Sequence, residues 1–230
     1  MNEQNRYLLL QVNDALFPIG GYSHSYGLET YIQKGLVDNA LQAEHYIHQK
    51  LKNTVLYTDL LTVRLAYEYA GAGDLEKLDL LDQLTEAGKV PTEIREASKK
   101  LGSRFMKTVR QLDVSYASPV FEDYVQRRGK KKVHHTCIYG VFCAAAGISE
   151  DDCLSHYLYA QTSAMVTNSV KSIPLSQTDG QKILQRSFPL LEELETQVMS
   201  MGEEMLNRSA PGFDIRCMQH EALYSRIYMS

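Results

Sequence analysis

Apolar residues recur along much of this chain every three or four positions, which is the spacing of one helix face. The strongest such stripe covers residues 94–112, and its apolar positions are Ile94, Ala97, Leu101, Phe105, Val109 and Leu112. A leucine stripe over residues 75–84 and another apolar stripe over residues 154–166 repeat the pattern. These stripes predict amphipathic helices whose apolar faces pack on a shared core.

Residues 137–146 differ from these stripes because they are apolar on almost every side. A helix without a polar face is buried, so we expect this helix at the centre of the fold. Residues 39–69 predict a long helical region with a bend at residues 52–54. Further along, Pro189 lies within a long apolar stripe, and we expect it to kink or divide that helix because it removes a backbone donor.

The composition favours long helices over many short strands, since the 230 residues include only 14 glycines and 6 prolines. With 44% hydrophobic residues, the chain can bury a substantial core. We find no internal repeat, low-complexity block or domain linker. The sequence therefore predicts an all-α fold, a single compact domain over residues 1–230 with about eight to ten helices.

Charge and cysteine usage narrow the class of protein. The net charge of −4 opposes a general nucleic-acid binder, which would carry a basic surface. No apolar run reaches the roughly 18 residues of a membrane span, and the polar N-terminus lacks a signal-peptide core. The four cysteines form no C-x-x-C pair, which indicates reduced, mostly buried thiols. We expect a cytoplasmic protein that binds neither nucleic acid nor membranes.

Residues 14–29 contain the densest group of side chains with chemical potential, namely Tyr22, Ser23, His24, Ser25 and Tyr26 directly after Gly20-Gly21. A nucleophile elbow requires G-x-S-x-G between a strand and a helix. Here a serine occupies the place of the second glycine, and the chain shows no alternating α/β pattern. We therefore interpret Ser23 or Ser25 as a helix cap, with Glu29 near the positive end of that helix.

Metal and nucleotide chemistry lack their usual signatures in this sequence. The seven histidines are scattered, without an H-x-x-x-H or H-E-x-x-H pair. Neither G-x-x-x-x-G-K-[ST] nor G-x-G-x-x-G occurs, which argues against the common nucleotide-binding loops. We expect no catalytic residue, no resident cofactor and no enzyme-grade metal site, so the sequence predicts a protein that is not an enzyme.

The tail over residues 213–230 is more apolar than a free chain end should be. Its apolar side chains include Leu223, Tyr224, Ile227, Tyr228 and Met229. Such a segment either folds back on the core or is covered by a partner. The turn at residues 14–29 and this tail are therefore the two candidate docking surfaces.

Five segments, in chain order, resemble the family of urease accessory proteins called UreF. They cover residues 8–31, 97–105, 135–142, 171–184 and 219–230. The first contains Phe17-Pro-Ile-Gly-Gly-Tyr-Ser-His-Ser-Tyr-Gly-Leu-Glu29, and the last reads Gln219-His-Glu-Ala-Leu-Tyr-Ser-Arg-Ile-Tyr-Met-Ser230. The residues of these segments are most similar to those of Helicobacter-type members. Because the ordered blocks span nearly the whole chain, coincidence is very improbable.

The resemblance implies an all-α homodimer that binds UreD, called UreH in some species, and then recruits the GTPase UreG. That assembly delivers nickel to apo-urease during maturation, with nickel only in transit past this chain. UreF would be a scaffold without catalysis. Two alternatives remain open, namely a modulator of GTP hydrolysis by UreG and a weak nickel-binding chaperone that uses His24 and a cysteine.

The resemblance also ties Tyr22 and Arg226 to partner recruitment, and tyrosine and arginine are enriched at the energetic centres of interfaces. The expected partner-binding residues are Tyr22, His24, Lys171, His220, Tyr224, Arg226 and Tyr228. Internal roles remain open for three of them: Tyr22 in the core, Arg226 in a salt bridge and Lys171 at a helix end. We expect residues 219–230 to order when UreD binds.

Overall fold

The computed structural model describes residues 3–208 and 210–230, and every regular element among them is helical. The first half comprises α1 (Glu3–Asn13), the 3-10 turn η1 (Gly21–Ser23), α2 (Leu28–Gln33), α3 (Ala40–Lys50), the π-helix η2 (Leu51–Leu60), α4 (Leu61–Gly71) and α5 (Leu75–Gly88). The second half comprises α6 (Thr92–Val109), α7 (Val120–Arg128), α8 (His135–Ala145), α9 (Glu150–Ser172), α10 (Gln177–Met199), the 3-10 turn η3 (Glu203–Met205) and α11 (Pro211–His220). The predicted all-α class is confirmed.

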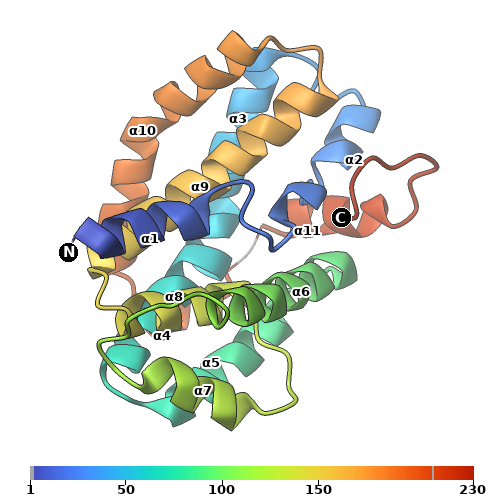
Figure 1. Ribbon diagram of the computed structural model, residues 1–230. Helices are drawn as coiled ribbons and strands as arrows, with labels where there is room; N and C mark the ends of the chain where they lie inside the picture. The colour runs from blue at the N-terminus through green and yellow to red at the C-terminus, as the bar shows by residue number, and fades with distance from the viewer. Residues whose placement is uncertain (1–2, 209) are drawn as a thin grey trace.

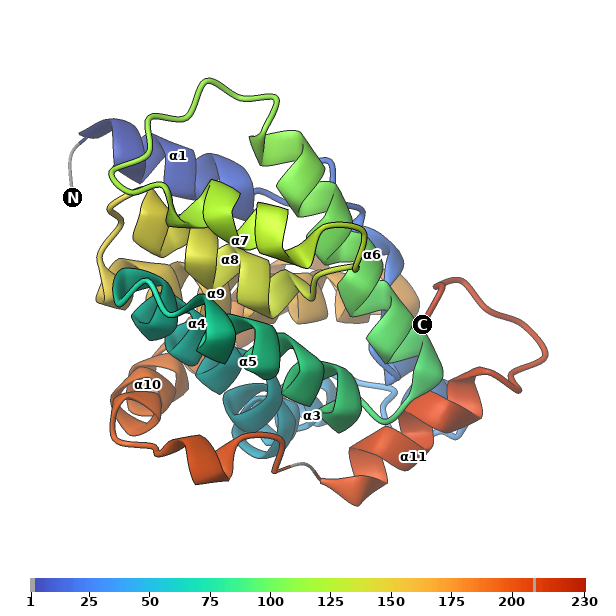
Figure 2. The ribbon, with the colours of Figure 1, turned by 90° about the horizontal axis from the view of Figure 1, so that it is seen from below.

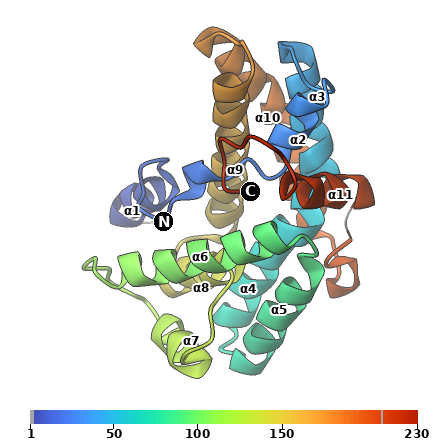
Figure 3. The same ribbon diagram turned by 90° about the vertical axis from the view of Figure 1, so that its right-hand side faces the viewer.

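The helices form two groups joined by one long rod (Figure 1). One group contains α3, α9 and α10, and the other contains α4, α5, α6, α7 and α8. Helix α3, the π-helix η2 and α4 are continuous, so this rod passes from one group into the other. Figure 3 shows the same division from the side, with the tail arching between α11 and α6.

Helix α8 lies at the centre of the second group, as its apolar sequence predicts. Nearly all of its side chains are buried, and it packs most extensively against α4. Gly140 allows this close approach, because a Cβ added there would lie 2.5 Å from the Val63 carbonyl oxygen of α4. One cluster of buried apolar side chains runs from Leu9 of α1 to Met201 beyond α10.

The sequence predicts two helix interruptions, and the structure rules out one of the two outcomes expected at Pro189. Where the bend is expected, at residues 52–54, the chain continues as the π-helix η2. Helix α10 extends on both sides of Pro189 without being divided. Its start is fixed by a capping box in which Ser176 and Asp179 satisfy each other's backbone donors.

The four cysteines are all buried and free, as their spacing predicts. Among residues 3–208 and 210–230, no helix combines the length and the apolarity that crossing a membrane requires. The tail and the N-terminal turn, which the sequence singles out, lie beside each other at the edge of the fold next to α2 and α6 (Figure 2).

Candidate functional site

The turn that precedes α2 is fixed by backbone geometry and by α6. Gly20 has a left-handed φ of 85°, which strongly favours glycine. A Cβ on Gly20 would also lie 2.4 Å from Nη1 of Arg104, which donates to the Ile19 carbonyl at 3.2 Å. The following turn η1 points Tyr22 outward, where its side chain is 64% exposed. The turn therefore presents Tyr22 on a rigid support.

The predicted capping of α2 by Ser23 or Ser25 is wrong. The residue before α2 is Gly27, which has a left-handed φ of 89° and no side chain to cap the helix. A Cβ on Gly27 would lie 2.7 Å from the Cys217 sulfur, so glycine here lets α11 pack closely on the turn. The Ser23 hydroxyl instead donates to the Gly20 carbonyl, and the Ser25 hydroxyl donates to the Ser230 carbonyl oxygen.

Residues 228–230 are anchored in this turn. The Ser230 carbonyl oxygen accepts from the Ser25 amide at 2.6 Å and from the Tyr26 amide at 3.1 Å. Nδ1 of His24 lies 2.8 Å from the Ser230 hydroxyl, and the Met229 amide donates to the Ser23 carbonyl. The Ser-His pair that suggests a catalytic turn in the sequence therefore holds the tail in place.

A second set of contacts surrounds His220, at the end of α11. This side chain is completely buried between two carboxylates, with Nε2 3.0 Å from Glu29 and Nδ1 2.7 Å from Glu93. Glu29 also accepts from the amides of Ile227 and Tyr228, at 2.7 and 3.0 Å. The buried His220 ring therefore bridges Glu29 of α2, Glu93 of α6 and the tail.

The seven predicted partner-binding residues fall into two groups. Tyr22, Lys171, Tyr224 and Arg226 are exposed, whereas His24, His220 and Tyr228 are buried within this chain. The buried three contact the turn, Glu29 or α9, so they can influence a partner only through the segments that they hold. This burial corrects their expected place on the surface, while a partner-binding role for the exposed four stays a prediction.

Sequence reasoning missed Glu29, Glu93 and Ser230 as members of this site. A glutamate in the first turn of a helix ordinarily interacts with that helix's own positive end. Glu29 instead binds residues 191 to 199 positions away, and no local pattern encodes such a contact. The sequence offered one signal, which is that Glu29 lies between Leu28 and Thr30. The structure buries all three residues.

The exposed loop 221–226 and its neighbours carry an apolar surface. Tyr224 is fully exposed, and the side chains of Ile227, Met229 and Tyr22 are also largely exposed. Arg226 lies at the end of this loop, and its Nη1 donates to Glu93 at 2.7 Å while the side chain stays 40% exposed. The predicted internal salt bridge of Arg226 is therefore present, yet part of the guanidinium remains accessible to a partner.

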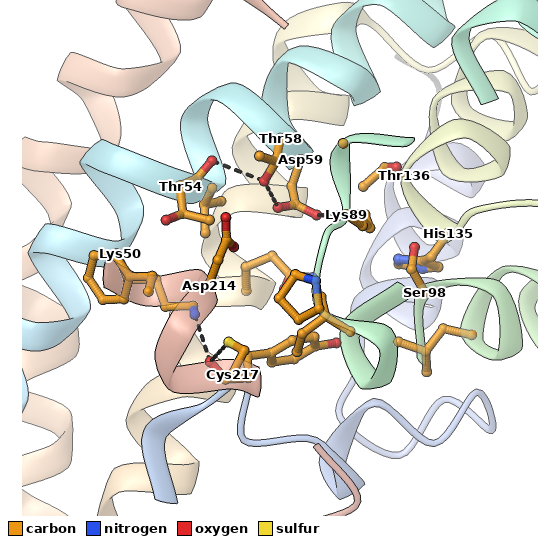
Figure 4. Close-up of a pocket in the computed structure, with 18 of the residues that line it drawn as sticks. Lys50, Thr54, Thr58, Asp59, Lys89, Ser98, His135, Thr136, Asp214 and Cys217 are labelled. Carbon is orange, nitrogen blue, oxygen red and sulfur yellow. Dashed lines mark hydrogen bonds and ion pairs between the residues drawn. The ribbon is translucent and has the colours of Figure 1, made fainter. Parts of the chain in front are cut away.

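A cavity of about 80 Å³ with a few polar groups in its wall lies beneath α11 (Figure 4). The π-helix η2 contributes Thr54 and Asp59 to its wall, and α11 contributes Cys217. Burial alone would raise the pKa of Asp59, but the Lys89 ammonium at 2.8 Å outweighs burial and lowers that pKa. Among the described residues, the buried atoms Thr54 Oγ1, His135 Nε2 and Thr136 Oγ1 have no hydrogen-bond partner. The space suits a few water molecules, which would satisfy such atoms.

The folded chain should lose stability as the pH falls from about 6.5 toward 4. Burial lowers the pKa of His24, His134 and His135 from 6.5 to about 4. The unfolded chain therefore binds protons more readily over this range, so the stabilisation is complete above 6.5 and is lost as the pH approaches 4. The measurement is the free energy of unfolding in urea at a series of pH values.

His135→Gln provides the matched variant for this prediction. It removes one titrating group, so the slope of stability against pH should fall by about 1.4 kcal/mol per unit within the window. An unchanged slope would show that His135 titrates normally in the folded chain. Lys171→Gln, at an exposed position on α9, should leave the slope unchanged.

The structure shows no cluster suited to a resident metal. Within residues 3–208 and 210–230, no group of three or more His, Cys, Asp or Glu side chains is arranged to hold an ion. His24 is turned toward Ser230, and Cys217 donates to the Tyr26 carbonyl. The turn and the tail instead form a surface to which the turn contributes the exposed Tyr22 and the tail contributes the exposed Tyr224.

Comparison with known proteins adds a family to this geometry. The family model described as UreF matches residues 37–188. Three similar relatives are each named urease accessory protein UreF. The protein from Bacillus sp. TB-90 is 34% identical over 98% of this chain and all of its own length. Those from Lachnoclostridium phytofermentans and Geobacillus kaustophilus are each 33% identical, over 96% and 100% of this chain and 97% and 100% of their own lengths.

Proposed function

Because this chain belongs to the UreF family of urease accessory proteins, we propose that it acts in urease maturation as a scaffold that recruits partner proteins. The observation that carries the proposal is the surface made by the turn and the tail. It combines the exposed Tyr22 and Tyr224 with a partly exposed Arg226. Tyrosine and arginine supply much of the binding energy at protein interfaces.

The proposed partners follow from the family. UreD, or UreH, would bind this chain first, and the pair would then recruit the GTPase UreG and act on apo-urease. Nickel would be cargo of this assembly rather than a cofactor of the chain. Lys171, exposed in the last turn of α9, is the proposed contact to the GTPase. A change in GTP hydrolysis by Lys171→Ala with binding intact would favour the role of a GTPase modulator.

We also propose that two copies of the chain form a homodimer. The support is an exposed apolar surface on α1 and the loop that follows it. Tyr7, Leu10 and Leu16 are all at least half exposed, and together with Phe17 and Pro18 they line a shallow groove. Exposed apolar surface of this kind commonly marks a protein interface.

Tyr22→Ala tests the scaffold. Removing a central interface tyrosine costs about 2 kcal/mol, so recruitment of UreG by the complex of this chain with UreD should weaken by roughly 30-fold. The measurement is the dissociation constant of UreG from the purified complex, by calorimetry. Leu80→Ala, at an equally exposed apolar position on α5, should leave that constant unchanged. Failure of the unmodified chain to form any complex with UreD and UreG would overturn the proposed function.

A further inference from the structure

The exposed loop 221–226 leaves and rejoins the body of the protein at two neighbouring points. It begins after His220, which is completely buried, and it ends before Ile227 and Tyr228, whose amides face the interior. Between these points the Gln33 side chain donates to the Ser225 carbonyl, and the Leu223 amide donates to the His220 carbonyl. The shape of the loop therefore depends on what holds its two ends.

One carboxylate holds both ends. Glu29 accepts from His220 at the start of the loop and from the amides of Ile227 and Tyr228 at its end. All of these donors belong to the tail, whereas Glu29 itself lies on α2, almost 200 residues earlier. Hydrogen bonds to a buried charged group are among the stronger ones in proteins. The contact closes loop 221–226 at its base.

Glu93 of α6 repeats this arrangement at the surface. Its Oε2 faces Nδ1 of His220, and its Oε1 accepts from Arg226. The two carboxylates thus face the His220 ring and the Arg226 guanidinium. Removing either carboxylate would leave one buried ring nitrogen of His220 without its partner, which is costly. Both acidic residues thus tie the beginning of the loop to its end.

We propose that Glu29 is a positioning residue for partner recruitment: it fixes the conformation in which loop 221–226 presents Tyr224 and Arg226. This inference rests on the proposed function, because Glu29 would hold in place the loop whose side chains form the proposed partner-binding surface. Glu29 is buried and does not itself reach a partner. It acts through the loop whose two ends it binds.

Glu29→Gln in the full-length chain tests the inference. The glutamine side chain can accept at one end of the loop, but its amide group presents donors to the donors at the other end. Hydrogen exchange of the Ile227 and Tyr228 amides should become at least roughly tenfold faster, while exchange in α8 stays unchanged. The dissociation constant for immobilised UreD should rise by a factor of about ten or more, by the same loss of loop order.

Two further variants separate positioning from general stability. Glu44→Gln breaks an ion pair between α3 and Arg186 of α10 that does not involve the tail, so it should change neither exchange of the tail amides nor binding. Glu93→Gln weakens only the contacts of Glu93 with His220 and Arg226, so it should give a smaller increase in exchange at the same amides. This second variant keeps the test valid if Glu29→Gln fails to fold. Weaker binding together with selectively faster tail exchange supports the inference.

The opposite results overturn it. Unchanged exchange at Ile227 and Tyr228 in both Glu29→Gln and Glu93→Gln would show that the carboxylates do not hold the loop. Faster exchange at these amides with unchanged binding of UreD would show that binding does not depend on the conformation of the loop. Either outcome leaves the proposed scaffold intact, whereas failure of the unmodified chain to bind UreD would strike the proposed function itself.

Discussion

Arg128→Met should lower the free energy of unfolding by about 3–5 kcal/mol at neutral pH, because it leaves a buried charge without its partner. The Asp82 side chain is 0% exposed, and its Oδ2 lies 2.6 Å from Nη2 of Arg128. The other Arg128 nitrogen, Nη1, contacts Asp79 at 2.5 Å. The two ion pairs join α5 to the end of α7, so the loss should appear in urea unfolding followed by circular dichroism.

The deficit of Arg128→Met should shrink in acid. Burial raises the pKa of Asp82, while the Arg128 guanidinium acts in the opposite direction. Without Arg128, Asp82 takes up a proton at higher pH, and the neutral carboxyl needs no counterion. The difference in free energy of unfolding between the variant and the unmodified chain is therefore largest above the pKa of Asp82 in the variant. It falls as the pH drops through that pKa. A deficit that stays constant from about pH 7 to 4 would contradict this explanation.

Two comparisons sharpen the Arg128 experiment. Arg110→Met removes an exposed ion pair with Glu122 and should cost less than about 1 kcal/mol. The double variant Arg128→Met with Asp82→Asn removes both charges, so it should recover part of the loss. A double variant as unstable as Arg128→Met alone would show that the guanidinium stabilises the fold through packing rather than through Asp82.

The sequence predicted the helices best where a long stripe leaves little choice. Residues 94–112 and 137–146 are examples, since one reads as an amphipathic helix and the other as a buried one, and α6 and α8 follow them closely. The π-helix η2 escaped prediction because its apolar spacing fits an interrupted α-helix equally well. Whether the backbone bends or widens there depends on neighbouring helices, which a local pattern does not contain.

The candidate site was located from the sequence, but its interior was not. The turn and the tail stand out by composition, and the structure brings them together. The sequence could not predict that His24, His220 and Tyr228 are buried. They lie in or beside irregular segments, where no regular repeat of apolar residues distinguishes a buried face from an exposed one. Glu29 was read as part of a helix start, although its partners are close only after the tail has folded back.

Removing residues 221–230 should reduce recruitment of UreD and UreG by a factor on the order of 100 or more, since several interface side chains are lost together. The deletion removes the exposed Tyr224, Arg226 and Ile227, and it also leaves Tyr22 on a turn that has lost its contacts with Ser230. Glu29 would lose both amide donors, which costs about 1–3 kcal/mol for each unsatisfied buried group. Co-purification from cells that express all three proteins measures the effect.

Stability must be separated from recruitment in this deletion, and a matched substitution allows it. Tyr224→Ala combined with Ile227→Ala keeps every contact of Glu29 with the backbone, so the chain should unfold at the normal temperature. If these side chains bind the partners directly, this variant should still lose most of the recruitment. If recruitment survives in both the variant and the deletion, the tail is not the docking surface, and the exposed Tyr22 turn must recruit without it.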